Sequence, residues 1–261
     1  MTAVGLDALL EFAVEIARSA GERTLPYFRN QTKIERKADG SFVTPADLET
    51  EEYLRQRIAE RFPDDAIVGE EFGERTGASE RTWIIDPIDG TFSFVHGVPI
   101  YGVLVGLETG GDAVLGVASF PALGDTVCAA RGQGCFLNGA AARVSTISTL
   151  ADALVLFNYP ATSAGQSDES AFAAAEKVRR RVGAQRGWGD CYGHTLVATG
   201  RAEIMLDPKV NVWDLAALLP IIEEAGGTLT DFAGRRTIRG NNAVTTNRVL
   251  LPEVLKILAE P

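Results

Sequence analysis

An apolar strand that runs directly into two carboxylates constrains this chain more than any other feature. Trp83–Ile85 is typical of a buried strand, Asp86 follows at its end, Pro87 stiffens the exit, and Asp89 lies three residues on. Gly90 lets the backbone come close to a ligand. Acidic residues at the end of an apolar strand cost free energy unless a base or a cation pairs with them. The segment therefore predicts a ligand-binding site, although Asp-Pro and Asp-Gly are also common in turns.

Two further groups of acidic residues stand where an apolar segment ends. Glu70 and Glu71 follow the run Ile67–Gly69, and Asp207 and Asp214 bracket a stretch in which a strand ends and a helix begins. Few basic residues lie near these acids in the sequence, so divalent cations are the expected partners. Simpler interpretations stay open. Glu71 is expected to be a solvated neighbour of Glu70, and Asp214 could be only the first-turn acid of its helix.

The charge balance restricts the partners of the protein. The chain has 261 residues, 25 Lys+Arg against 35 Asp+Glu, and a formal net charge of −10. This acidity argues against a nucleic acid or an anionic membrane as a partner. An acidic protein that acts on a phosphate ester needs metal ions to supply positive charge. Because the chain has two His, carboxylate ligands for a hard cation are better supplied than a His-rich zinc site. His96 and His194 are expected to be structural or peripheral rather than catalytic.

The sequence indicates a cytoplasmic protein. The N-terminal segment has no basic stretch followed by an apolar one, so no signal peptide is expected. The longest uncharged apolar stretches, 93–107 and 113–124, are too short to span a membrane and contain Pro and Gly. Three Cys without C-x-x-C spacing indicate reduced thiols.

The first half of the chain, 1–150, predicts an α+β lobe with an antiparallel sheet. Apolar residues at helical spacing predict a helix from Leu6 to the neighbourhood of Pro26. A second helix is expected to start with Thr44 as N-cap and Pro45 as first residue, in which case Asp47 could be only a capping acid. Consecutive strands are expected over 66–69, 82–85, 101–107, 113–120 and 126–130.

From about residue 151 the pattern predicts an α/β lobe that continues to residue 261. Strands are expected over 153–158 and 202–206, and helices over 169–181, 191–199 and 214–225, the last ended by Gly226-Gly227. Alternation of strand and helix indicates an α/β second half packed on the α+β first half.

Four ordered motifs carry a family resemblance. Trp83–Thr91 resembles the W-x-x-D-P-x-D-G-T signature of the inositol monophosphatase-like family of magnesium-dependent phosphatases. Val43–Asp47, Val68–Glu71 and Trp213-Asp214 resemble its other motifs in the family's order, and the resemblance covers essentially the whole chain. It implies a layered α-β-α-β-α sandwich, a homodimer, and two or three magnesium ions in each active site.

The resemblance also implies a role for each motif residue. Asp86 would be shared by two metals, and Asp47 and Thr91 would orient and deprotonate the attacking water together with the metal ligand Glu70. Gly90 and Thr91 would offer backbone N–H groups to the phosphate. The implied metal ligands are Glu70, Asp86, the Ile88 carbonyl, Asp89 and Asp214.

The second half points to a cationic leaving group. Asp190, within Gly187–Gly193, and Asp207 are carboxylates without matching bases, and a charge-assisted hydrogen bond to an ammonium or imidazolium is stronger than one to a polyol hydroxyl. This half is similar to the histidinol-phosphate phosphatase branch of the family, so L-histidinol phosphate is the expected substrate. Asp190 could instead be an N-cap or first-turn acid. The expected substrate-binding residues are Asp89, Gly90, Thr91, Gly189, Asp190 and Asp207.

Three alternatives stay open. Phe92 stands where that branch commonly has a basic residue, and Phe94–Gly97 resembles the inositol phosphatases, so inositol 1-phosphate is the alternative substrate. A non-catalytic phosphate- or metal-binding protein is the alternative from another class, although the full set of catalytic acids argues against it. The charged loop Lys33–Ser41 could close over the site or be a solvated hairpin.

Overall fold

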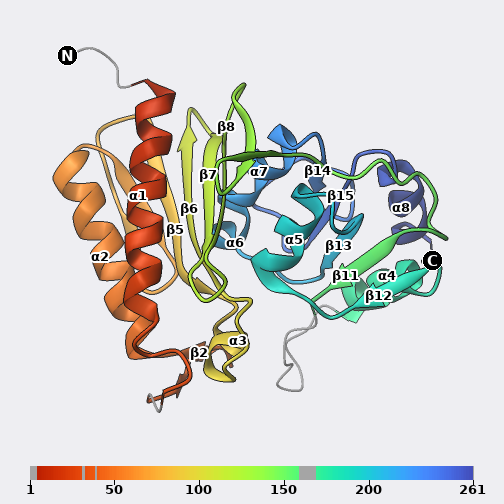
Figure 1. Cartoon of the computed structure of the whole chain (residues 1–261), viewed down its shortest axis with the longest axis horizontal. Coiled ribbons are helices and arrows are strands. Elements are labelled where there is room, and N and C mark those ends of the chain that lie inside the picture. The colour runs from red at the N-terminus through yellow and green to blue at the C-terminus, as the bar shows by residue number, and fades with distance from the viewer. Residues whose placement is uncertain (1–4, 31–32, 39, 159–168, 261) are drawn as a thin grey trace.

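The computed structural model describes residues 5–30, 33–38, 40–158 and 169–260. These residues form five layers, seen from left to right in Figure 1: two helices, a large sheet, a helical middle layer, a second sheet, and two outer helices. The predicted α-β-α-β-α sandwich is confirmed. In the described part of the chain, no helix is both long enough and apolar enough to cross a membrane.

The first layer consists of α1 (Leu6–Thr24) and α2 (Pro45–Arg61). Both helices lie where the sequence predicts them. At the start of α2 the Thr44 hydroxyl accepts from the Ala46 amide at 3.2 Å, and the Thr44 amide donates to Asp47 Oδ2 at 2.8 Å. This reciprocal capping satisfies amides that have no partner within the helix, so Asp47 is held in place by the helix start itself.

The large sheet has the strand order β10-β9-β8-β7-β6-β5-β3-β4. Its strands are β3 (Ala66–Gly69), β4 (Gly73–Arg75), β5 (Arg81–Asp89), β6 (Gly102–Thr109), β7 (Asp112–Phe120), β8 (Asp125–Ala130), β9 (Gly134–Leu137) and β10 (Ala140–Ala142). Neighbouring strands are antiparallel as predicted, with the exception of β3 and β5. Because β3 and β5 are parallel and Gly69 pairs with Ile85, the next residues, Glu70 and Asp86, lie at the same end of the two strands.

Strand β5 is longer than the predicted segment 82–85 and includes Pro87. Its pairing with β6 shifts register between Asp86 and Asp89. A proline has no N–H to donate, and a bulge is one of the places where a sheet tolerates it. The irregularity therefore allows the strand to continue through the acidic segment.

The second sheet has the order β12-β11-β13-β15-β14, with strands β11 (Leu154–Phe157), β12 (Ala184–Arg186), β13 (Ile204–Asp207), β14 (Thr228–Thr230) and β15 (Ala243–Thr246). Helices α4 (Glu169–Arg179) and α8 (Leu251–Leu258) lie on its outer side, and α5 (Asp190–Ala198) on its inner side (Figure 1). Strands β12, β14 and β15 and helix α8 lie outside the predicted elements.

One helix predicted for the middle layer is wrong. Instead of one helix over 214–225, the chain forms α6 (Val212–Ala216) and α7 (Leu218–Glu224). Pro220 cannot donate to the carbonyl of Ala216, so the helical hydrogen-bond ladder is interrupted at this junction. Here the layers come very close: a Cβ added to Gly116 in β7 would lie 1.9 Å from the Ala217 carbonyl oxygen.

Candidate active site

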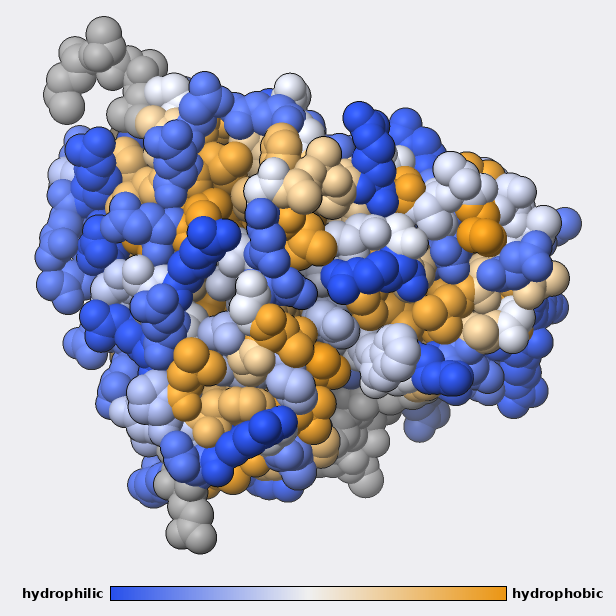
Figure 2. Space-filling view, viewed as in Figure 1, coloured by the Kyte–Doolittle hydropathy of each residue, from blue (hydrophilic) through white to orange (hydrophobic). Residues whose placement is uncertain are grey.

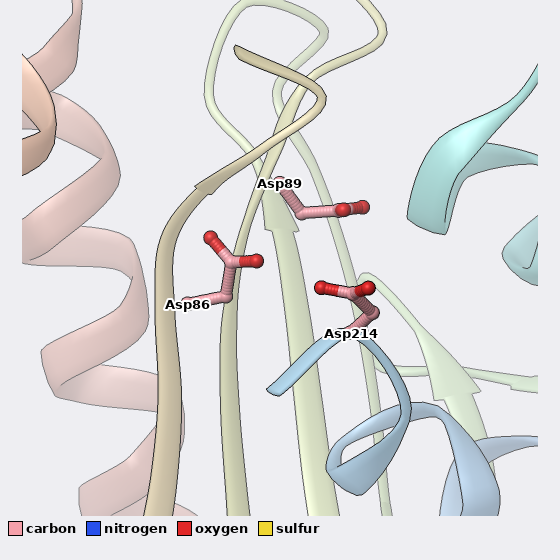
Figure 3. A group of neighbouring side chains, drawn as sticks. All are labelled: Asp86, Asp89 and Asp214. Carbon is pink, nitrogen blue, oxygen red and sulfur yellow. The ribbon is translucent and has the colours of Figure 1, made fainter. Parts of the chain in front are cut away.

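Three carboxylates converge between the large sheet and the middle layer. Asp86 and Asp89 come from β5 and Asp214 from α6, and each offers an oxygen within 4.8 Å of the other two. Figure 3 shows the three side chains pointing toward one another. Oxygen donors in this arrangement suit a hard divalent cation. The structure therefore brings together three of the predicted metal ligands.

The irregular end of β5 explains how two of its residues reach one site. Residues three apart on a regular strand point to opposite faces. The register shift after Asp86 breaks this alternation, and the Ile88 amide donates to Asp86 Oδ1 at 3.0 Å. Gly90 then has a φ of 82°, a left-handed conformation that favours glycine.

Asp214 reaches the site as part of a helix start. The Asn211 amide donates to Asp214 Oδ2 at 2.7 Å. The interpretation of Asp214 as a first-turn acid is thus confirmed, and it does not exclude a site role, because the same carboxylate lies in the three-acid group. Capping fixes the orientation of the side chain before any ligand binds.

Asp47 likewise serves the helix and faces the site. Its Oδ2 accepts from the Thr44 amide at 2.8 Å and the Thr44 hydroxyl at 2.6 Å. Its Oδ1 lies 3.4 Å from the hydroxyl oxygen of Thr91, which also donates to the Ile88 carbonyl at 3.0 Å. Asp47 is therefore joined to the end of β5 through Thr91.

Lys37 meets the acids that follow β3. It lies between β1 (Glu35–Arg36) and β2 (Phe42–Val43), and its Nζ is 2.7 Å from an oxygen of Glu70 and 2.7 Å from one of Glu71. The expectation that Glu71 is solvated is wrong, because its side chain is 4% exposed. The charged hairpin thus reaches the site through Lys37.

Burial and mutual repulsion act on the acids of this site. Burial, followed by the negative charge of Glu70, raises the pKa of Asp86 well above its usual range. Burial also raises the pKa of Asp214 strongly, that of Asp89 to about 7 and that of Asp47 to about 6. A bound divalent cation would relieve the repulsion and favour the ionised forms. The electrostatics therefore fit a metal site.

A second acidic group adjoins the first. Asp190 is the first residue of α5, and Gly189 is the N-cap of that helix. Asp190 has a φ of 56°, and its Oδ1 accepts from the Asn158 side chain at 2.7 Å. The Cys191 amide donates to Asp89 Oδ2 at 2.5 Å and so ties α5 to the metal-ligand strand. An added Cβ on Gly90 would lie 2.9 Å from Asp190 Oδ2, so a larger residue there would have to displace the Asp190 carboxylate.

Asp207 lies at the end of β13 in the same region. Its side chain is 7% exposed, and among the described residues its Oδ1 has no hydrogen-bond partner. Burial raises the pKa of Asp190 and of Asp207 to about 7. His194 Nε2 is 3.9 Å from Asp207 Oδ2, but burial lowers the pKa of His194 to about 4, so this ring is neutral at pH 7. An orphaned buried carboxylate oxygen needs a donor, which a ligand can supply.

Several interactions of the site have no signal in the sequence, and three of them involve a residue that was not among the predicted site residues. Lys37 contacts Glu70 and Glu71, Asn158 contacts Asp190, and Glu51 of α2 accepts from the amide of Glu71. No local pattern indicates these contacts, because each joins segments that are distant in sequence. The charged loop around Lys37 was the only one of these features that the sequence brought forward.

Comparison with known proteins agrees with this geometry. Residues 5–260 match the model of the inositol monophosphatase family. The chain is 46% identical over 243 residues to a histidinol-phosphatase of Chlorobaculum parvum, covering 92% of this chain and 93% of that protein. It is 32% identical over 254 residues to a fructose-1,6-bisphosphatase/inositol-1-monophosphatase of Thermotoga maritima, covering 96% of each. The structure of an IMPase from Thermotoga maritima superposes with a TM-score of 0.87 at 31% identity, covering 96% of each chain.

Fold, site and relatives together define a phosphoric monoester hydrolase. The chain belongs to the inositol monophosphatase family.

The raised pKa values predict how the stability of the metal-free protein depends on pH. Asp89, Asp190 and Asp207 bind protons in the folded state up to a pKa of about 7, whereas unfolded aspartates lose them near the ordinary value of 3.8. The free energy of unfolding should therefore fall as the pH rises from about 4 to about 7.

Thermal unfolding followed by circular dichroism, with EDTA or with saturating magnesium, measures this dependence. We expect a lower Tm at pH 7 than at pH 5 in EDTA, and a larger stabilisation at pH 7 by any divalent cation that the site binds. A metal-free Tm that rises over this interval would contradict the prediction.

Proposed function

We propose that this protein is a magnesium-dependent phosphomonoesterase that hydrolyses L-histidinol phosphate to L-histidinol and phosphate. The observation that carries the proposal is the pair of adjoining acidic groups: Asp86, Asp89 and Asp214 on one side, and Asp190 with Asp207 on the other. The first group suits a metal-assisted phosphoryl transfer, and the second suits a cationic leaving group. The similarity to a histidinol-phosphatase supports the same substrate.

The site would hold two or three magnesium ions. Asp86 would be shared between two of them. When bound, such ions polarise the phosphoryl group and lower the pKa of a bound water. The raised pKa values of the buried acids are the observation that fits this donor set. The proposed ligands are Glu70, Asp86, the Ile88 carbonyl, Asp89 and Asp214.

The chain's own residues would handle the proton and the phosphate. Thr91 lies between Asp47 and the Ile88 carbonyl, so its hydroxyl can hold a water oriented for attack on phosphorus. Asp47, whose pKa is raised to about 6, is mostly ionised at neutral pH and can accept the proton of that water. The backbone N–H groups of Gly90 and Thr91 would bind the phosphate oxygens at the start of α3 (Thr91–Val95).

The leaving group would lie against the second acidic group. Among the described residues no donor reaches the buried Oδ1 of Asp207, and the Oδ1 of Asp190 accepts from the Asn158 side chain. An ammonium or imidazolium supplies both the missing hydrogen bond and the compensating charge. Gly189 approaches Asn158 closely, because an added Cβ would lie 2.8 Å from the Asn158 Cβ. A neutral polyol would leave the charges of both acids uncompensated.

One feature favours inositol 1-phosphate as the second candidate. Phe92 follows Thr91, is 53% exposed, and stacks against Phe42 and His96 at centroid distances of 5.7 and 4.3 Å. Figure 2 shows hydrophobic side chains gathered on the lower part of this face, around α3. The chain thus offers an aromatic surface, and no base, at the position after Thr91.

A phosphate-release panel tests the substrate. With magnesium present, we expect the highest kcat/KM for L-histidinol phosphate, compared with inositol 1-phosphate and adenosine 3′,5′-bisphosphate. Asp190→Asn should raise the KM for histidinol phosphate by about 10-fold or more, since a hydrogen bond to a charged group contributes roughly 1.5–3 kcal/mol. The same variant should change the KM for inositol 1-phosphate much less.

The exposed Asp152, whose carboxylate accepts from the Thr149 hydroxyl, offers the matched control Asp152→Asn, which should behave as the wild type. A preference for inositol 1-phosphate would refute the proposal that L-histidinol phosphate is the substrate, and it would leave the proposed metal site unaffected. Magnesium-dependent ligand binding without phosphate release from any ester would favour the non-catalytic alternative.

We also propose, from the family resemblance, that the protein acts in the cytoplasm as a homodimer. Sedimentation equilibrium measures its mass in solution directly.

A further inference from the structure

The turn after β3, which carries Glu70, rests on a buried carboxylate of α2. The side chain of Glu51 is 0% exposed. Its Oε2 accepts from the Glu71 amide at 2.7 Å, and its Oε1 accepts from the Phe72 amide at 3.1 Å and from Arg55 Nε at 2.7 Å. Glu51 therefore fixes the backbone directly after Glu70 without using the Glu70 side chain.

The contact between helix and turn is close enough to exclude other side chains. A Cβ added to Gly69 would lie 2.2 Å from Glu51 Oε1 and 2.9 Å from Arg55 Nη2. Arg55 Nη2 also donates to the carbonyl of Gly73, so the Glu51–Arg55 ion pair holds the turn at both of its ends. A buried carboxylate with three donors is well compensated, and loss of one partner leaves a costly imbalance.

The same face of α2 serves two parts of the site. Asp47 and Glu51 are four residues apart and both are buried, so they lie one turn apart on one face of the helix. Asp47 contacts Thr91 after β5, and Glu51 holds the turn after β3. This face therefore determines where the turn that bears Glu70 lies relative to the end of β5.

We propose that Glu51 is a positioning residue that holds the Glu70–Glu71 turn in its metal-binding arrangement and thereby sets the affinity of the site for divalent cations. The inference rests on the proposed function, because it takes Glu70 as a metal ligand. Glu51 itself contacts the backbone and Arg55, and no role as a ligand is assigned to it. Residues that orient metal ligands from outside typically change metal affinity by about 10- to 100-fold when replaced.

Glu51→Gln tests the proposal with a side chain of the same size. The amide group cannot accept at both positions, so its NH2 must face either the Glu71 amide or the Phe72 amide together with Arg55. We expect magnesium binding, measured by isothermal titration calorimetry, to weaken by about 10-fold or more. The magnesium concentration for half-maximal phosphate release should rise in parallel, and saturating magnesium should restore most of kcat.

Glu60→Gln is the matched control on the same helix. The Glu60 side chain is 58% exposed and accepts from Gln56 at 2.8 Å, away from the turn. Its magnesium affinity should equal that of the wild type. Circular dichroism reports whether each variant is folded. If Glu51→Gln does not fold, Arg55→Gln replaces it, with an expected loss of affinity in the same direction.

Two outcomes would count against the proposal in different ways. A folded Glu51→Gln protein that binds magnesium as the wild type does, even with a lower Tm, shows a purely structural role and overturns the inference alone. The same holds for Arg55→Gln where it is the variant measured. A wild-type protein that binds no magnesium overturns the proposed function, and the inference with it.

Discussion

Asp86→Asn is expected to lower phosphate release by about 1,000-fold or more while the protein stays folded. Asp86 is 1% exposed, and its carboxylate lies within the group formed with Asp89 and Asp214. Asparagine keeps the shape of the side chain and removes the charge that two cations would share. Because burial and the charges of Glu70 and Asp89 disfavour the ionised form of Asp86, the metal-free variant should be at least as stable as the wild type.

Three measurements distinguish loss of metal from loss of fold. Phosphate release at saturating magnesium gives the rate, calorimetry gives the metal affinity, and the Tm in EDTA reports the fold. We expect magnesium to raise the Tm of the wild type and to raise that of Asp86→Asn much less. The exposed Asp64 provides the control Asp64→Asn, which should retain full activity. Near-normal turnover by Asp86→Asn would refute the assignment of Asp86 as the shared ligand.

Gly116→Ala is expected to destabilise the protein by about 3 kcal/mol, or close to 10 °C in Tm. The added Cβ would lie 1.9 Å from the carbonyl oxygen of Ala217 and 2.7 Å from its Cα. Both are backbone atoms at the α6–α7 junction, so no side-chain rotation can relieve the overlap. The large sheet and the middle layer must move apart, and Asp214 lies on the helix that moves.

A graded pair of controls tests the cause of this effect. Gly106→Ala meets the same junction at 2.8 Å, so it should destabilise less than Gly116→Ala. Gly5→Ala, where nothing lies within 4 Å, should leave the Tm nearly unchanged. Thermal unfolding in EDTA measures all three variants. An unchanged Tm for Gly116→Ala would show that the two layers do not depend on this approach.

The local part of the site was predictable because it rests on short-range chemistry. The capping residues Thr44, Pro45 and Asp47 specify a helix start, and the α2 boundary follows them. The apolar run before Asp86 specifies a strand, although the strand continues through Pro87 because its pairing with β6 shifts register there. Hydrogen bonds between neighbouring residues leave a pattern in the sequence that can be interpreted without the fold.

The missed parts depend on contacts between distant segments. Nothing near Glu71 in the sequence indicates that Lys37 would bury it, and nothing near α2 indicates that Glu51 accepts from the turn after β3. Short strands such as β12 and β15 were missed because a few residues carry too little periodicity to be distinguished from loops.

The sequence by itself determined the chemical type of the site: carboxylates after apolar strands in an acidic chain, in an order that resembles a family of magnesium-dependent phosphatases. Only the tertiary structure decided which acids meet. The parallel pairing of β3 with β5 brings Glu70 and Asp86 to the same end of the two strands, and the α6–α7 layer brings Asp214 to Asp89. The reason is physical, since burial and repulsion among charges depend on distances in space, which spacing along the chain does not specify.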